Sequence, residues 1–355
     1  YDSWTRHFRL HLPVVEPDLW QNNLTLVTEM LSFLTGDHWE ISLRRREQQD
    51  EQDREDAEEP EFQPSGVCLF SGGLDSYIGA LELLEAKERL ALVGHHGAGT
   101  ANQAQLQAHR VVENHYPDRS LWLHLYVQPP MPEVGEPEKT TRSRSILFLA
   151  LGTAVACSYG EPLPLYVPEN GLISLNPPLT DSRMGSLSTR TTHPHFLALY
   201  RELLNALGTG VSVETPYRFT TKGEMAKNML SNAAFTAGVD YSVSCSHPDV
   251  GRYQGASPGQ HCGYCVPCII RRAALLKAGI DDPKSYLTDI RTNPPARGSE
   301  TSRDLRAFEM ALARFDPDDG DRHVFEVLST GPIPPNNIED FVDVYRRGML
   351  EVQDF

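Results

Sequence analysis

The sequence predicts an α/β fold in which a parallel, twisted β-sheet is covered by helices on both faces. Two observations predict it. Short apolar runs alternate with segments of helical periodicity from residue 65 to residue 230, and a Gly-Gly turn lies between the first run and the first helical segment. Ligands bind beyond the carboxyl ends of the strands in such sheets, so we expect a functional site at this turn.

The predicted core elements alternate along the chain. Strands are expected where apolar residues form short runs, at residues 67–70, 90–94, 121–127, 163–167 and 211–214. Helices are expected where apolar residues recur at helical spacing, at residues 74–86, 103–115, 143–156, 194–207 and 222–230. With the cysteine-rich segment that follows, these elements define a core domain at residues 65–290.

A small N-terminal α/β accessory unit, residues 1–48, precedes the core. Residues 8–14 and 39–43 alternate like strands and residues 19–34 have helical spacing, which predicts a strand–helix–strand unit. It is too small to be stable alone, so it packs on the core or on a partner, unless it extends the main sheet. Residues 49–64 are predicted to be a flexible acidic linker, because residues 47–61 hold nine Asp or Glu against one Arg.

A helical C-terminal extension, residues 291–355, follows the core. Helical spacing recurs at residues 303–315 and 338–350, on either side of a stretch rich in Pro and Gly at residues 331–335. A further helix is expected at residues 268–278, started by Pro267. The extension is expected to support the core or a protein interface.

Charge and composition exclude several classes of protein. The formal net charge of −16 disfavours binding to a nucleic-acid backbone. The longest apolar run, at residues 146–157, is too short for a membrane span. Six cysteines in 355 residues, with no recognisable signal peptide, indicate a reducing and therefore cytoplasmic compartment.

Residues 71–76, Ser-Gly-Gly-Leu-Asp-Ser, form the candidate phosphate-binding turn. Adjacent glycines let backbone N–H groups approach an anion, and the following helix adds the positive end of its dipole. Ser71 and Ser76 could donate hydroxyl groups to phosphate, and Asp75 could hold the Mg²⁺ that accompanies a nucleotide. The alternative is an ordinary strand-to-helix turn in which Ser71 or Asp75 caps the helix.

Four cysteines, Cys245, Cys262, Cys265 and Cys268, have the spacing of a metal site. A C-x₂-C turn places two sulfur atoms about 2.3 Å from one ion, and four thiolates with two of their gaps at two residues match a tetrahedral Cys₄ zinc knuckle. The alternatives are an iron–sulfur cluster, whose ligands can also be two residues apart, and a disulfide pair. With four thiolates available, neither His247 nor His261 is expected to be a ligand.

The turn and the cysteines, in this order, resemble two motifs of the 7-cyano-7-deazaguanine synthase family, known as QueC. The turn looks like the PP-loop of N-type ATP pyrophosphatases, which cleave ATP to AMP and pyrophosphate while forming an adenylate. Residues 141–145 resemble the family's arginine motif, and residues 221–224 its lysine motif. Residues 179–183 lie where the family has a segment that lines the deazaguanine pocket. The resemblance covers roughly residues 65–280 and implies an adenine nucleotide alpha hydrolase-like fold.

The resemblance also implies roles for individual residues. Catalytic roles go to Asp75, Ser76, Arg144 and Lys222. ATP binding goes to Ser71, Gly72, Gly73, Leu74, Asp75, Ser76, Arg144 and His96, the last at the end of the second core strand. Substrate binding goes to Glu169, Asn170, Asp181 and Arg183. One of Arg271 and Arg272 is expected to reach a phosphate. The implied cofactors are ATP, Mg²⁺ and a structural Zn²⁺.

The sequence also departs from the housekeeping members of that family. The flanking regions and residues 168–177 and 187–194 look like the QueC-like proteins of anti-phage defence systems, namely the Qat system and type IV CBASS. The implied enzyme is a ligase that adenylates 7-carboxy-7-deazaguanine, or a related deazapurine, and transfers the acyl group to an amine of a partner protein from the same operon. Two alternatives remain: a synthase that uses ammonia to make 7-cyano-7-deazaguanine, and a catalytically silent nucleotide-binding scaffold or sensor.

Overall fold

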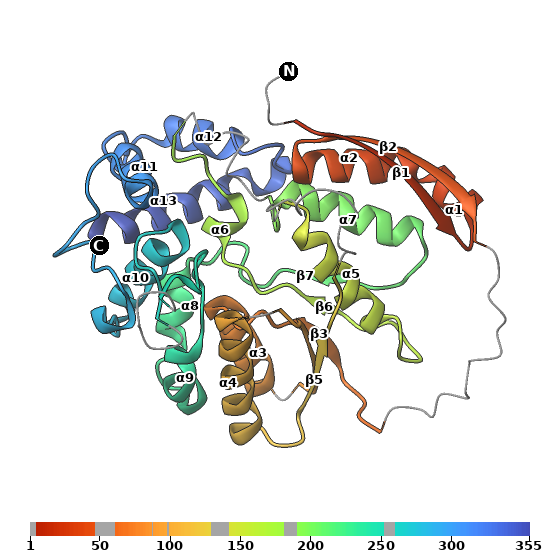
Figure 1. The fold of residues 1–355 in the computed structure, drawn as a ribbon, viewed down its shortest axis with the longest axis horizontal. Helices are drawn as coiled ribbons and strands as arrows, with labels where there is room; N and C mark the ends of the chain where they lie inside the picture. Colours follow the sequence, from red (N-terminus) through yellow and green to blue (C-terminus); the bar gives the residue numbers. More distant parts are fainter. Residues whose placement is uncertain are drawn as a thin grey trace.

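The computed structural model describes residues 5–46, 61–86, 88–97, 99–128, 142–180, 190–251 and 260–355. Its core is a five-stranded sheet in the order β5-β4-β3-β6-β7, and every pairing in it is parallel. The strands are β3 (Gly66–Leu69), β4 (Leu90–His95), β5 (Ser120–Leu125), β6 (Leu165–Tyr166) and β7 (Val213–Glu214). The predicted parallel α/β sheet is therefore confirmed (Figure 1).

Helices cover both faces of the sheet, and alternating strand residues supply the two cores. Helices α3 (Leu74–Glu85) and α4 (Thr100–His115) pack on the face that contains Cys68 and Leu92. Helices α5 (Arg144–Ala156) and α7 (Pro194–Ala206) pack on the face that contains Val67 and Val93. Both faces are apolar because a parallel strand covered on both sides has no solvent-facing side.

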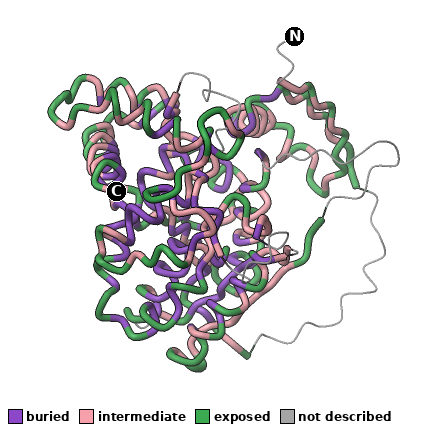
Figure 2. Tube along the Cα trace, turned by 60° about the vertical axis from the view of Figure 1, so that its left-hand side comes forward, coloured by how far each residue is buried: buried purple, intermediate pink, exposed green. Residues whose placement is uncertain are grey.

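The N-terminal unit forms a second, separate sheet. Strands β1 (His7–Val14) and β2 (His38–Arg45) pair in parallel, and the chain between them forms α1 (Pro17–Asn22) and α2 (Leu24–Thr35). Met30 and Leu34 of α2 are buried in the same cluster as the apolar side of α7. The unit thus packs on the core and does not extend the main sheet, and its strands stay half-buried or exposed (Figure 2).

Seven α-helices, besides those that cover the sheet and those of the N-terminal unit, complete the described fold. Helix α6 (Gly171–Leu175) follows β6, and α8 (Lys222–Asn228) and α9 (Ala233–Gly238) follow β7. Helix α10 (Val266–Ala278) follows the cysteines, and the C-terminal region adds α11 (Arg303–Leu312), α12 (Gly320–Leu328) and α13 (Ile338–Asp354). The helical C-terminus is confirmed, and its apolar residues share a cluster with α6 and α10.

The structure differs from the expected elements in several places. The helix expected at residues 19–34 is broken at Asn23, whose side chain donates to the Leu19 carbonyl oxygen at 2.9 Å. Strands β6 and β7 are only two residues long, and helices α6, α9 and α12 were not predicted. Short helices such as α6 and α9 have too few turns for a detectable periodicity. Most of the linker expected at residues 49–64 lies outside the described residues. None of the helices in the described ranges combines the length and the apolar character that a bilayer crossing requires.

Candidate functional site

The turn at residues 71–76 connects the carboxyl end of β3 to the first turn of α3. Gly72 has a φ of 79°, and a Cβ there would lie 2.8 Å from the Cα of Gln105 in α4. The Gln105 side chain donates to the Phe70 carbonyl oxygen, and a Cβ at Gly94 would lie 2.2 Å from its Nε2 atom. Two glycines and one buried amide therefore fix the path of the turn, which explains why a side chain is excluded at Gly72.

Three hydroxyl groups surround the turn. The Ser71 and Ser76 hydroxyl oxygens lie 3.1 Å apart, and Ser71 accepts from the Gly73 amide at 3.3 Å. Ser244 accepts from the Leu74 amide at 3.1 Å, and the Val243 amide donates to Gly72 at 2.9 Å. Backbone amides and hydroxyl groups gathered at a helix N-terminus form a suitable environment for an anion. No sequence motif pointed to Ser244, which lies 170 positions after Leu74.

Asp75 belongs to the first turn of α3 and is only 5% exposed. One carboxylate oxygen accepts from the Lys222 ammonium group, and the other accepts from the Asn170 side chain at 2.6 Å and from its backbone amide at 3.2 Å. Burial alone would raise the pKa of Asp75, but Lys222, Glu169 and Asn170 together lower it. Asp75 is therefore an ionised carboxylate that is fully enclosed by polar partners.

Glu169 is the second carboxyl group of this cluster. The residue is half-buried, but its carboxyl group is enclosed by protein. Burial and the neighbouring charge of Asp75 raise its pKa well above the usual range, and it shares a hydrogen bond with Asp75. A lowered pKa on one carboxyl group beside a raised pKa on its neighbour is the pattern of two acids that share a proton. Oxygen donors of this kind fit a hard divalent cation, which would replace the shared proton.

Asn170 and Lys222 each begin a short helix, which aims them at Asp75. Asn170 caps α6 by accepting from the Ile173 amide at 3.1 Å, while its Nδ2 donates to Asp75. Lys222 follows the N-cap Thr221, which forms a capping box with Glu224. Lys222 is 5% exposed and pairs with Asp75. In the structure Glu169 and Asn170, predicted as substrate residues, contact Asp75.

The two arginines of the arginine motif have different surroundings. Arg142 is 7% exposed and donates to the Thr35 carbonyl oxygen at 3.1 Å and to Asp37 at 3.3 Å in the N-terminal unit. Arg144 is exposed at the start of α5, with its guanidinium 5.2 Å from the centre of the Phe148 ring. Arg142 therefore anchors the motif, and Arg144 is the residue available to a ligand.

His96 lies just beyond β4, among other aromatic rings. Its ring centre is 4.6 Å from that of His124 and 5.7 Å from that of Tyr126, and its Nε2 lies 3.3 Å from the Asn102 side chain. The preceding His95 bonds to the Val127 carbonyl oxygen at 2.6 Å. His96 thus belongs to a ring cluster at the end of β4 that could contact a planar base.

The four cysteines converge on one point. Their sulfur atoms all lie within 4.8 Å of one another, with Cys245 and Cys265 at 4.0 Å and Cys262 and Cys268 at 3.8 Å. A tetrahedral ion with bonds of about 2.3 Å separates its sulfur ligands by about 3.8 Å, so the donor set fits zinc. Backbone amides of residues 246, 247 and 262 also donate to these sulfurs at 3.3–3.5 Å. The set contains neither His247 nor His261.

Both arginines of α10 are bound to protein groups, which corrects the expectation that one reaches a phosphate. Arg271 is 1% exposed and donates to Ser242 at 2.8 Å and to the Val239 carbonyl oxygen at 2.9 Å. Arg272 pairs with Asp281 and Asp289. Burial with matching acceptors leaves neither guanidinium available to a ligand.

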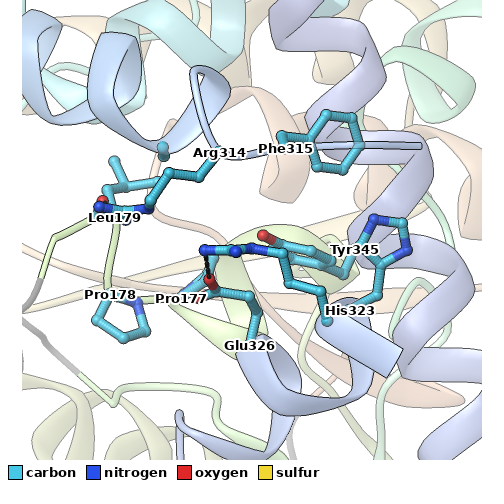
Figure 3. A pocket seen from close by; sticks show the side chains of 10 residues that line it. Pro177, Pro178, Leu179, Arg314, Phe315, His323, Glu326 and Tyr345 are labelled. Atoms are coloured by element: carbon cyan, nitrogen blue, oxygen red, sulfur yellow. Dashed lines mark hydrogen bonds and ion pairs between the residues drawn. The ribbon is translucent and has the colours of Figure 1, made fainter. Parts of the chain in front are cut away.

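Asp181 and Arg183, predicted to contact the substrate, lie outside the described residues. The described residues before this gap stop at Thr180. Leu179 lines a cavity together with Arg314, Tyr345 and other residues of the C-terminal region (Figure 3). Arg314 donates to the Leu179 carbonyl oxygen at 3.1 Å. The C-terminal region therefore holds the start of the segment that contains both residues.

Comparison with known proteins gives partial matches to one group. No family model matches the chain. The 7-cyano-7-deazaguanine synthase of Cupriavidus taiwanensis is 38% identical over 96 residues, which are 26% of this chain and 39% of that protein. The synthase of the same name from Coxiella burnetii is 29% identical over 103 residues, 27% of this chain and 41% of that protein. The chain thus spans about two fifths of these relatives.

A longer match has lower identity. The 7-cyano-7-deazaguanine synthase of Thiobacillus denitrificans is 27% identical over 249 residues, which are 63% of this chain and 99% of that protein. The chain is thus similar to synthases of this name at modest identity.

Proposed function

We propose that this chain is a cytoplasmic, ATP-dependent carbon–nitrogen ligase that adenylates 7-carboxy-7-deazaguanine or a related deazapurine. One observation carries the proposal: a glycine-rich turn that carries the hydroxyl groups of Ser71 and Ser76 also contains Asp75, which forms a buried ion pair with Lys222. The similarity to synthases of the 7-deazaguanine group supports the choice of substrate.

In the proposed reaction the turn binds the β- and γ-phosphates of ATP. Amides of the turn and the hydroxyls of Ser71 and Ser76 donate to phosphate oxygens, and His96 contacts the adenosine. The substrate carboxylate attacks the α-phosphorus, and the bond to pyrophosphate breaks. Lys222 and Arg144 stabilise the negative charge of the leaving pyrophosphate. No γ-phosphoryl transfer is involved, because the turn has no Gly-Lys-Ser/Thr sequence.

The second step transfers the acyl group. An amine attacks the carbonyl carbon of the adenylate, AMP leaves, and the amine proton passes to a base. The adenylate is already a good electrophile, so the protein's contribution is orientation. We propose that Asp181 and Arg183 help to bind the deazaguanine ring. Mg²⁺ that accompanies ATP would neutralise phosphate charge, and Asp75 and Glu169 are the carboxyl groups that fit it.

The four cysteines would hold a structural zinc ion. All four available ligand positions of a tetrahedral ion would be filled by protein sulfur, which leaves no open position for catalysis. The knuckle supports the site through Val243 and Ser244, which directly precede Cys245 and bond to the turn.

For the acceptor, we favour an amine of a partner protein encoded in the same anti-phage defence operon. The regions outside residues 65–280 support this choice, because they provide additional surface beside the site. Transfer to ammonia is the alternative reaction: it gives the amide, and a second round with ATP removes the amide oxygen with AMP to leave the nitrile, 7-cyano-7-deazaguanine. A silent scaffold is disfavoured by the buried Asp75–Lys222 pair, since a buried charge pair is costly to keep.

The experiment is a product analysis. Purified protein is incubated with ATP, Mg²⁺ and 7-carboxy-7-deazaguanine, with and without ammonia or co-expressed partner proteins, and AMP, ADP and pyrophosphate are quantified. We expect AMP and pyrophosphate in equal amounts, and their loss in Lys222→Ala. ADP in place of AMP would overturn the proposal, and a protein adduct of deazaguanine mass would identify the acceptor as a protein.

A further inference from the structure

Helix α13 packs against the two short helices that begin at the Asp75 cluster. A Cβ at Gly171 in α6 would lie 2.8 Å from the Val344 side chain, and a Cβ at Gly348 in α13 would lie 2.9 Å from the Leu172 side chain. These two glycines therefore allow close approach of α6 and α13. The same helix also reaches α8, although more than a hundred residues separate them in the sequence (Figure 1).

Glu351 of α13 contacts the N-terminal turn of α8 directly. It is 7% exposed, accepts from the Thr221 hydroxyl group, and accepts from the Gly223 amide at 3.2 Å. A Cβ at Gly223 would lie 2.5 Å from the Glu351 carboxylate. Lys222 lies between these two contacts, so both neighbours of Lys222 are bound to one carboxyl group.

Arg347, one helical turn before Glu351, completes the contact. It donates to both carboxylate oxygens of Glu224 and to the Phe219 carbonyl oxygen at 2.8 Å. Glu224 in turn accepts from the Thr221 amide at 2.9 Å within the capping box. The residues before and after Lys222 are thus held by α13 on both sides.

We propose that α13 is the element that positions Lys222, with Glu351 as the positioning residue. This inference rests on the proposed role of Lys222 at the phosphate site. The first residue of a helix is normally free to fray, because its amide neighbours have no intrahelical partners. Glu351 accepts from the Gly223 amide, and Arg347 holds Glu224, whose carboxylate accepts from the Thr221 amide. The Lys222 ammonium group is thereby held at Asp75. Among the described residues no cation forms an ion pair with Glu351, so its contact with α8 consists of hydrogen bonds.

The test compares Glu351→Ala with Lys222→Ala and with a matched control. The control is Glu339→Ala, an exposed carboxylate in the first turn of the same helix. We measure the affinity for Mg²⁺–ATP by calorimetry and the rate of AMP formation, after circular dichroism has verified the helix content of each variant. We expect Glu351→Ala to lower the rate or the affinity by about 10- to 100-fold, the range for a lost supporting contact, and Glu339→Ala to leave both unchanged.

A double variant separates positioning from general support. If Glu351 acts through Lys222, Glu351→Ala causes no further loss when Lys222 is already alanine, whereas independent effects would multiply. Glu351→Gln keeps an acceptor for Thr221 but loses the one for Gly223, so its values should fall between wild type and Glu351→Ala. Wild-type values in Glu351→Ala, or multiplying losses in the double variant, overturn the inference.

The two proposals fail in distinguishable ways. If wild-type protein forms no AMP, the proposed function is wrong, and the affinity for Mg²⁺–ATP still decides the role of Glu351. If wild-type protein forms AMP and Lys222→Ala does not, while Glu351→Ala matches wild type in rate and affinity, the function stands and the positioning role is wrong. If wild-type protein binds no nucleotide, both proposals are wrong.

Discussion

The N-terminal unit and helix α13 each hold a buried carboxyl group against a segment that carries a cation of the site. In the N-terminal unit, Asp37 contacts Arg142, two residues before Arg144. In the C-terminal region, Glu351 contacts both neighbours of Lys222. Both regions lie outside residues 65–280, yet each contacts a segment that carries a residue of the candidate site.

The two carboxyl groups differ in their partners and therefore in their pKa. Asp37 is 2% exposed, and burial would raise its pKa, but Arg6 and Arg142 lower it below its usual range. Glu351 accepts from a hydroxyl and an amide, and burial raises its pKa. Ion pairs with arginine stabilise the charged form, whereas neutral donors compensate burial only in part. A buried carboxyl group thus holds its neighbouring segment by charge in the N-terminal unit and by hydrogen bonds in the C-terminal region.

Metal removal should have the strongest effect, and it should affect the region around the four cysteines but not the N-terminal unit. Structural zinc sites contribute about 10–16 kcal/mol of binding free energy in small peptides, which exceeds or matches the stability of a typical domain. We expect a chelator to abolish amide-exchange protection at residues 243–251 and 260–268 and to weaken nucleotide binding, while α2 stays protected. Hydrogen exchange with mass spectrometry measures both regions in one experiment. Equal protection with and without chelator would mean that the cysteines hold no structural metal.

Asp37→Ala should have the next largest effect. It leaves Arg142 buried without its carboxylate, and breaking a buried ion pair typically costs about 3–5 kcal/mol. Glu351→Ala removes only hydrogen bonds and should lower the free energy of unfolding by about 1–3 kcal/mol. Denaturant titration of both variants ranks them. A larger loss of stability in Glu351→Ala than in Asp37→Ala would contradict the view that Asp37 acts through ion pairs and Glu351 through hydrogen bonds.

The pH dependence of stability should differ in sign between the two carboxyl groups. The pKa of Glu351 is raised in the folded protein. Its contribution to the free energy of unfolding is therefore full below the unfolded pKa of 4.5 and is lost as pH rises through the folded pKa. The pKa of Asp37 is lowered in the folded protein. Its contribution to the free energy of unfolding is therefore present above the unfolded pKa of 3.8 and is lost as pH falls through the folded pKa. Wild type should therefore gain stability relative to Glu351→Gln as pH falls from 7 to 4.5. Over that interval its advantage over Asp37→Asn should stay constant, as urea titrations at several pH values can verify.

The smallest effect is expected at an ion pair on the surface of the N-terminal unit. Arg9 and Glu40 lie 2.7 Å apart on neighbouring strands but are 77% and 65% exposed. Exposed pairs contribute about 0–1 kcal/mol, because solvent screens them and both side chains lose freedom. Arg9→Ala should change the free energy of unfolding by less than about 1 kcal/mol in the same titration. A loss as large as that of Asp37→Ala would mean that burial does not explain the difference between the pairs.

Local patterns predicted much of the fold. The alternation of apolar runs and helical segments depends on residues that are close together in the sequence. The parallel sheet and the position of the turn were therefore predictable. The convergence of Cys245 with Cys262, Cys265 and Cys268 was predictable from their spacing, because two-residue gaps between cysteines are typical of metal sites. Strands β6 and β7 were predicted too long, because the apolar runs extend beyond the two residues of each strand.

The contacts around the site were less predictable, because they join residues that no local pattern links. Ser244 and Leu74 lie 170 positions apart, and Glu351 and Thr221 lie 130 apart. A single Glu on an amphipathic helix has no feature that distinguishes it from its solvent-exposed neighbours. Asn170 was expected at the substrate, and the structure shows it bound to Asp75 and to α6. The roles of the individual site residues stay predictions that the experiments above test.

The bond between Leu74 and Ser244 has a consequence for how the protein matures. The turn at residues 71–76 is synthesised early, but its partners Val243 and Ser244 precede Cys245 and arrive about 170 residues later. A metal ion captured by the four sulfurs would fix these partners in place. The ability to bind a nucleotide would then depend on the cell's supply of that ion. A cell short of the ion would accumulate full-length chains that do not bind nucleotide.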